Sequence, residues 1–120
     1  MKTIIIDTNF FLAIYQFKID IFQEIQNLLP FSYQIITIDK VIQELENIKG
    51  KDKTAANYAL KLIKEKDLKI LKTGEGHTDD ILINLSKKAI ISTQDKELKQ
   101  KLKNYITIRQ KKYLIIKNVL

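Results

Sequence analysis

Short isoleucine-rich runs alternate with longer amphipathic segments along the chain. The runs at 2–6, 34–38, 68–71 and 89–91 have the length and apolar content of buried strands. The segments between them repeat their apolar residues at the spacing of a helix. Strands that alternate with helices form a mostly parallel sheet with helices on both faces. The pattern therefore predicts an α/β fold with three layers, α/β/α, in a single domain over residues 1–120.

Polar residues and turn formers mark the ends of the predicted helices. We expect Asp39 and Thr78 to cap helix N-termini, because a short polar side chain there can accept a hydrogen bond from a free backbone amide. Gly50 is expected to end a helix. The predicted helices span 10–15, Asp20 to Pro30, Asp39 to Gly50, 53–66, Thr78 to Leu85 and 94–102, and two further short strands span 105–108 and 114–116.

A carboxylate directly follows the first predicted strand. Asp7 comes after Ile4, Ile5 and Ile6, which can only be buried. A charge inside a sheet would lose its hydration without compensation. In open α/β sheets, however, ligands bind beyond the carboxyl ends of the strands. We therefore expect Asp7 to lie in the crevice at that edge.

Other acids are expected to reach the same edge. Asp95 follows another buried strand, Asp79 and Asp80 lie in the first turn of a predicted helix, and Glu44 borders the apolar stripe of its helix. Carboxylates that converge in a crevice repel one another unless a cation lies among them. An all-oxygen site suits Mg²⁺ or Mn²⁺, which can activate water against a phosphodiester. The single histidine, His77, is expected to be a loop residue rather than a ligand.

The overall charge fits a polyanionic partner. The chain carries 21 Lys and Arg against 14 Asp and Glu, a formal net charge of +7. Such a surface attracts nucleic acid, although a solvated lysine-rich surface explains the charge equally well. The same alternatives hold for Arg109, Lys111 and Lys112. The lack of cysteine excludes disulfides and thiolate metal sites. No apolar run is long enough for a membrane span, so we expect a soluble cytoplasmic protein.

Four segments resemble, in order and spacing, the acidic motifs of PIN-domain nucleases. They are I-I-I-D-T-N-F-F-L, V-I-Q-E-L-E-N-I, T-D-D-I-L-I and I-I-S-T-Q-D-K-E-L. The chain looks most similar to small archaeal-type PIN proteins, which include VapC-like toxins and relatives of nucleases that process ribosomal RNA. The resemblance implies a magnesium- or manganese-dependent endoribonuclease that cleaves single-stranded RNA to 5′-phosphate and 3′-hydroxyl ends. It also implies a homodimer and, for a toxin, an antitoxin protein as partner.

The resemblance assigns roles to individual residues. It implies that Asn9 holds neighbouring carboxylates in place and that Thr93 supports the last acid. In the third motif, consecutive helical residues point about 100° apart, so one acid faces the metal squarely. We favour Asp79, because Leu82 and Ile83 place it on an apolar stripe, and leave Asp80 to the helix dipole or a second metal. The implied catalytic and metal-binding residues are Asp7, Glu44, Asp79 and Asp95.

Simpler interpretations stay open. Asp79, Asp80 and Asp95 could each only stabilise a helix N-terminus, and Glu44 could be a solvated helix residue. A phosphatase with an Asp-x-Asp motif is disfavoured, because Asn9 stands where the second acid would be. The main rival function is a PIN-like module that binds RNA or protein without cleaving. The sequence leaves open whether Phe17 and Phe22 belong to the core or to a dimer surface.

Overall fold

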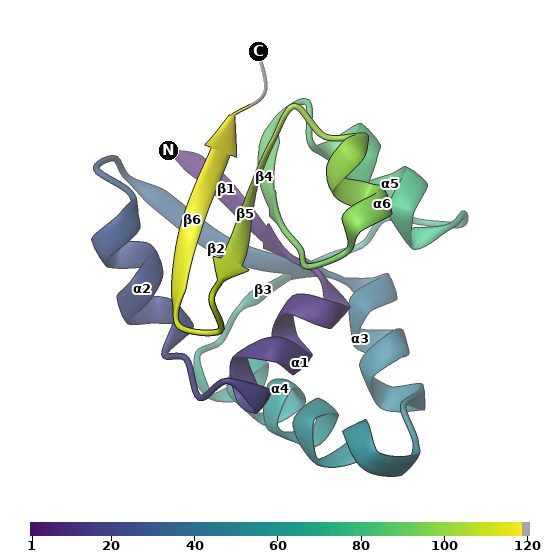
Figure 1. Ribbon diagram of the computed structural model, residues 1–120. Helices are drawn as coiled ribbons and strands as arrows, with labels where there is room; N and C mark the ends of the chain where they lie inside the picture. Colours follow the sequence, from purple (N-terminus) through teal and green to yellow (C-terminus); the bar gives the residue numbers. More distant parts are fainter. Residues whose placement is uncertain (119–120) are drawn as a thin grey trace.

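A six-stranded sheet organises residues 1–118, which are the residues that this computed structural model describes (Figure 1). The strand order is β3-β2-β1-β4-β5-β6, and only the pairing of β5 with β6 is antiparallel. This arrangement confirms the predicted α/β class and its mostly parallel sheet. The strands are β1 (Lys2–Ile6), β2 (Tyr33–Ile38), β3 (Lys69–Leu71), β4 (Ala89–Ser92), β5 (Asn104–Arg109) and β6 (Tyr113–Asn118).

Helices connect the strands and cover both faces of the sheet. Helices α1, α3 and α4 pack against one another, whereas α5 and α6 lie together beside β4 and β5 (Figure 1). No helix within residues 1–118 is long and apolar enough to cross a bilayer. The helices are α1 (Thr8–Gln16), α2 (Ile21–Leu28), α3 (Asp39–Asn47), α4 (Lys53–Glu65), α5 (Thr78–Leu85) and α6 (Lys96–Gln100), with a 3₁₀ turn, η1 (Gly50–Asp52), before α4.

Two predicted helix caps are wrong. The residues at the N-cap positions of α3 and α5 are Ile38 and His77, and neither makes a capping hydrogen bond through its side chain. Asp39 and Thr78 are each the first residue of the helix. Asp39 accepts from the amide of Lys40 in its own helix at 3.0 Å, but both side chains also reach another element. Asp39 accepts hydrogen bonds from the amide and hydroxyl groups of Thr73, at 3.2 and 2.6 Å.

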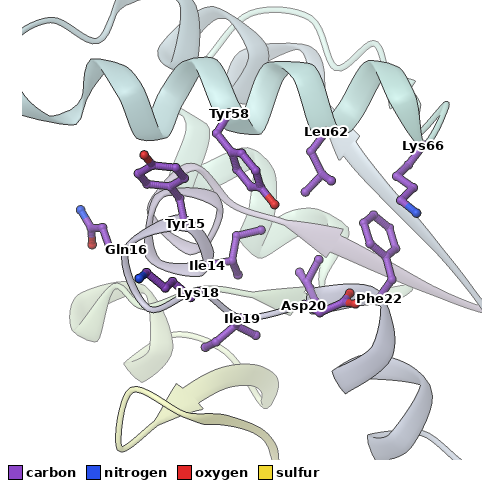
Figure 2. Close-up of a pocket in the computed structure, with 11 residues that line it drawn as sticks. Ile14, Tyr15, Gln16, Lys18, Ile19, Asp20, Phe22, Tyr58, Leu62 and Lys66 are labelled. Carbon is purple, nitrogen blue, oxygen red and sulfur yellow. The ribbon is translucent and has the colours of Figure 1, made fainter.

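A hollow of about 630 Å³ lies between α1, α2 and α4 (Figure 2). The rings of Tyr15 and Tyr58 meet at its rim, with their centroids 5.1 Å apart. The ammonium group of Lys66 lies 5.1 Å from the centroid of the Phe22 ring. This hollow is lined by none of the five candidate acids, which are Asp7, Glu44, Asp79, Asp80 and Asp95. The predicted metal chemistry therefore belongs to another part of the surface.

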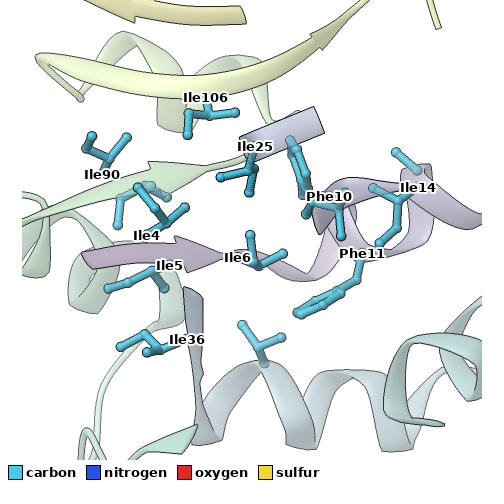
Figure 3. Close-up of a cluster of buried hydrophobic side chains, with 14 of the residues drawn as sticks. Ile4, Ile5, Ile6, Phe10, Phe11, Ile14, Ile25, Ile36, Ile90 and Ile106 are labelled. Carbon is cyan, nitrogen blue, oxygen red and sulfur yellow. The ribbon is translucent and has the colours of Figure 1, made fainter. Parts of the chain in front are cut away.

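The core surrounds the central strand β1. Ile4, Ile5 and Ile6 are almost fully buried, because β1 lies between β2 and β4 and is covered on both faces (Figure 3). A strand in that position has no solvent face, which explains why its sequence is continuously apolar. Phe17 and Phe22 are half-buried and pack against this core. The carboxyl end of β1 is therefore held by the best-packed part of the molecule.

Candidate active site

Asp7 lies at the carboxyl end of β1 and is only 5% exposed. Its amide donates a 3.0 Å hydrogen bond to the carbonyl of Ser92 at the end of β4. Its carboxylate caps α1 by accepting from the amide of Thr8 at 2.8 Å, and Oδ2 accepts from the hydroxyl of Thr93 at 2.9 Å. Burial raises the pKa of Asp7 to about 6, against these hydrogen bonds and with the help of negative charge on Glu44 and Asp79.

Thr93 joins the first acid of the site to the last. Its side chain is fully buried. While its hydroxyl donates to Asp7, its Oγ1 accepts from the amide of Asp95 at 3.1 Å. The side-chain oxygen of Asn9 lies 3.2 Å from the same hydroxyl and accepts from the amide of Gln94 at 2.9 Å. Asn9 thus contacts the loop that carries Asp95 through the hydroxyl of Thr93 and the amide of Gln94.

Glu44 is exposed on α3, but both of its oxygens are engaged. Oε1 accepts a short hydrogen bond from the hydroxyl of Thr8, and Oε2 accepts from the hydroxyl of Thr78 at 2.8 Å. The first residues of α1 and α5 therefore fix the carboxylate between them. This geometry differs from that of a freely solvated helix residue.

The two acids of the third segment point to different surroundings. Partial burial raises the pKa of Asp79, and the negative charges of Asp95 and Glu44 add to the effect. The cation of Lys101 opposes it. Asp80 instead lines a separate hollow of about 560 Å³ together with His77, at the start of α5. The different surroundings follow from the rotation of about 100° between consecutive helical residues.

Asp95 is the N-cap of α6. Its Oδ1 accepts from the amides of Glu97 and Leu98, at 2.9 and 3.2 Å. The expectation that α6 would begin at Gln94 and end at 102 is wrong, because the cap starts the helix only at Lys96. Asp95 therefore has the structural role of a helix-capping acid and, at the same time, lies close enough to Asp79 to raise its pKa.

The donor chemistry of this edge fits a hard divalent cation. Its polar atoms are carboxylate and hydroxyl oxygens, and burial together with the charges of neighbouring acids raises the pKa values of Asp7 and Asp79. Within residues 1–118, however, no group of three or more acidic or histidine side chains is arranged so that it could hold a metal ion. The hydrogen bonds explain this: Glu44 is turned to two threonines, and Asp95 is turned to its own helix. The carboxylate oxygens that a metal ion requires lie at one edge of the sheet. The side chains of Glu44 and Asp95 must rotate before these oxygens can bind the same ion.

Sequence reasoning missed three residues that organise this edge. Thr8 and Thr78 hold Glu44, and each stands directly beside an acid that the sequence singled out. Gln94 accepts from the hydroxyl of Thr107 and the amide of Ile108, both at 2.7 Å, and so ties the loop before Asp95 to β5. The sequence did contain a signal for the two threonines, because each is adjacent to a candidate acid. No pattern in the sequence pointed to Gln94.

Comparisons with known proteins agree with this architecture. Residues 4–111 match the family described as a PIN like domain. The chain is 34% identical over 129 aligned positions to Ribonuclease VapC4 of Methanocaldococcus jannaschii, covering 97% of each chain. It is 33% identical to Ribonuclease VapC9 of Archaeoglobus fulgidus over 108 positions, which cover 86% of this chain and 77% of the relative.

A solved structure shares the fold at lower sequence identity. The PIN domain endonuclease Utp24 superposes with a TM-score of 0.83 and 23% identity, covering 98% of this chain and 92% of that chain. The similarity therefore extends over the whole sheet and its helices.

Proposed function

The chain belongs to the PIN-like domain family, and from that premise we propose that it is a metal-dependent endoribonuclease that hydrolyses single-stranded RNA. One observation carries the proposal: acids from four separated segments lie near one another at a single edge of the sheet. Besides burial, the charges of Glu44 and Asp79 raise the pKa of Asp7, and the charges of Asp95 and Glu44 raise the pKa of Asp79. Keeping Asp7 buried and without a cationic partner is costly for a folded chain. A site that binds a divalent cation gives this arrangement a function.

The four acids Asp7, Glu44, Asp79 and Asp95 would hold Mg²⁺ or Mn²⁺. When bound, the ion supplies positive charge that acidifies water and stabilises the phosphate oxygens. Thr93 supports this role by holding Oδ2 of Asp7 while it accepts from the amide of Asp95. Asn9 supports it by fixing the loop between Thr93 and Asp95. We leave Asp80 to a second metal or to the helix dipole.

The names of the two relatives favour a toxin over a ribosomal-RNA-processing enzyme. We therefore propose that residues 1–120 form one nuclease domain, that the protein acts in the cytoplasm as a homodimer, and that an antitoxin protein restrains it. The neighbouring gene tests this role, because an antitoxin is normally encoded directly beside its toxin. Light scattering of the purified protein tests the dimer.

Cleavage of a labelled single-stranded RNA tests the activity itself. We expect cleavage with Mn²⁺ or Mg²⁺, none in EDTA, and products with 5′-phosphate ends. Glu44→Gln should lower the rate at least about a hundredfold, which corresponds to about 2.7 kcal/mol of transition-state stabilisation. Glu46→Gln is the matched control, because Glu46 is exposed on the same helix and should be replaceable without loss.

The rival function makes the opposite prediction. A non-catalytic PIN-like module would bind RNA equally well with and without metal and would cleave it under neither condition. RNA binding without cleavage by the native chain in Mn²⁺ would therefore overturn the nuclease proposal.

A further inference from the structure

The hairpin of β5 and β6 carries aromatic and basic side chains on one face. Tyr105 is opposite Lys117 and Arg109 is opposite Tyr113 in the antiparallel register. Directly opposed residues project to the same side of a sheet, and so do residues an even number of positions apart. All four side chains therefore share a face. The bond between Thr107 on this face and Gln94 shows that the face is turned toward the loop before α6.

Cations gather on this face without acidic partners. The ammonium group of Lys99 on α6 lies 5.6 Å from the centroid of the Tyr105 ring. Burial lowers the pKa of Lys99, and the neighbouring charges of Arg109, Lys96 and Lys117 lower it further. Within residues 1–118 the one ion pair joins Lys61 and Glu65, on α4. The cations on the hairpin face thus repel one another, and no carboxylate of residues 1–118 forms an ion pair with them.

The same face begins at the candidate active site. Strands β4 and β5 are parallel, so Arg109 at the end of β5 lies at the same sheet edge as Asp95 after β4. Asp95 is also close enough to Lys99 to affect the pKa of its ammonium group. From Arg109 back to Tyr105 the strand covers about 13 Å, at about 3.3 Å per residue. Thr107 between these two residues is buried and bonded to Gln94, so the open part of the face runs along β6, from Tyr113 opposite Arg109 to Lys117 opposite Tyr105. This part leads away from the acids for a length that exceeds one phosphate group.

We propose that the hairpin face, defined as Tyr105, Arg109, Tyr113 and Lys117 together with Lys99 of α6, binds the RNA strand on one side of the cleaved bond. This inference rests on the proposed function. Unpaired cations match the phosphate backbone, and an exposed tyrosine ring is a stacking platform for an unpaired base. Tyr113 is 40% exposed, which leaves its ring available. An acidic peptide would use the cations but would leave the rings without a stacking partner.

Binding measured without cleavage tests this surface separately from the chemistry. Fluorescence anisotropy with a labelled oligouridylate in EDTA gives the affinity of the native chain and its dependence on salt. The double variant Arg109→Gln/Lys117→Gln should bind about tenfold or more weakly, and the slope of log K against log salt should fall by about 1.4, or 0.7 for each lost phosphate contact. Tyr113→Leu should weaken binding with the salt slope unchanged.

The matched control removes two cations elsewhere. Lys87 and Lys88 are exposed just before β4, at the opposite end of that strand from the acids. The variant Lys87→Gln/Lys88→Gln has the same net charge as the hairpin double variant, and it should keep the native affinity and slope. Thermal unfolding of all variants checks that the hairpin is intact.

The outcomes separate the two proposals. Equal loss of affinity in the hairpin and control double variants would overturn the hairpin surface even if the native chain cleaves RNA. Native affinity of Tyr113→Leu, together with equal competition by polyglutamate, would also overturn it and indicate an acidic peptide. Selective loss in the hairpin variants supports the surface even if no metal restores cleavage, a result that would reject only the nuclease proposal.

Discussion

The two sides of the candidate site are built in different ways. On one side, Asp7 and Thr93 are buried, and their hydrogen bonds run through strand ends and backbone amides. On the other side, Glu44 and Asp79 are exposed on helices, and Glu44 is held by threonine hydroxyls alone. The buried side is positioned by the same packing that stabilises the fold. The exposed side can change its geometry at little cost, which suits residues that must turn toward a ligand.

Neutralising the buried acid should have the largest effect. The pKa of Asp7 in the folded chain, about 6, lies above its ordinary value of 3.8. The folded state therefore holds a proton that the unfolded state releases, and stability should fall as pH rises from about 4 to about 6. The difference amounts to roughly 3 kcal/mol without metal. Asp7→Asn should abolish RNA cleavage yet show no such loss of stability.

Urea unfolding in EDTA below pH about 4 and above pH about 7 measures this slope. Asp20→Asn is a control for the removal of one carboxylate outside the candidate site, because Asp20 is exposed at the N-cap of α2. A native chain whose free energy of unfolding is constant across this range would contradict the picture of a costly buried charge.

On the exposed side, the two adjacent acids should differ sharply. Asp79→Asn should lower the cleavage rate about a hundredfold, because Asp79 shares its surroundings with Asp95 and Glu44. Asp80→Asn should lower it less than about threefold, because Asp80 lies toward a different hollow. Initial rates in Mn²⁺ measure both. Equal losses of cleavage rate in the two variants would show that both acids contribute to catalysis, as a second metal ion would require.

Removing the hydroxyl of Thr93 should disturb the buried side. Thr93→Val keeps the shape of the side chain but leaves Asp7 Oδ2 and the amide of Asp95 each without a partner. We expect a loss of about 1–3 kcal/mol in the free energy of unfolding and a further rise in the pKa of Asp7. Thr37→Val removes another buried hydroxyl, which donates to the Ile6 carbonyl at 2.9 Å. That control should lose stability without moving the pH dependence.

The smallest effect is expected from the tether of Glu44. Thr78→Val removes one of the two hydroxyl groups that donate to Glu44, and Thr78→Ser retains that hydroxyl group. Because the other donor, Thr8, stays in place, cleavage should fall no more than about tenfold, equivalent to 1.4 kcal/mol. The Mn²⁺ concentration for half-maximal rate should fall in Thr78→Val, because Glu44 then turns more freely toward the ion, and it should return to the native value in Thr78→Ser. A loss shared by both variants would point to a structural role for the position.

The sequence predicted the sheet well, because its strands are short continuous apolar runs whereas its helices repeat their apolar residues at helical spacing. Its errors occur where one residue decides a boundary. Asp39 and Thr78 look like caps in the sequence, yet the preceding residues, Ile38 and His77, have the extended backbone of a cap. Only the three-dimensional positions of Thr73 and Glu44 explain where those side chains turn instead.

Within the site, the sequence pointed to the acids and, through the family resemblance, to Asn9 and Thr93 as supports. It did not point to Thr8, Thr78 or Gln94 in that role. An acid after a buried strand is conspicuous because burial of charge is costly. The role of Gln94 depends on β5 lying beside β4, a long-range pairing that no local pattern encodes. The same holds for Thr8, whose partner Glu44 is 36 residues away.

The pairing of β1 with β4 also has a consequence for the timing of activity. The carbonyl of Ser92 and the hydroxyl of Thr93, which hold Asp7, are separated from it by most of the chain. During translation the N-terminal part of a protein emerges first, so Asp7 must wait for its partners until β4 has been made. If the chain cleaves RNA as proposed, a nascent copy would remain inactive toward its own messenger RNA until β4 has been synthesised.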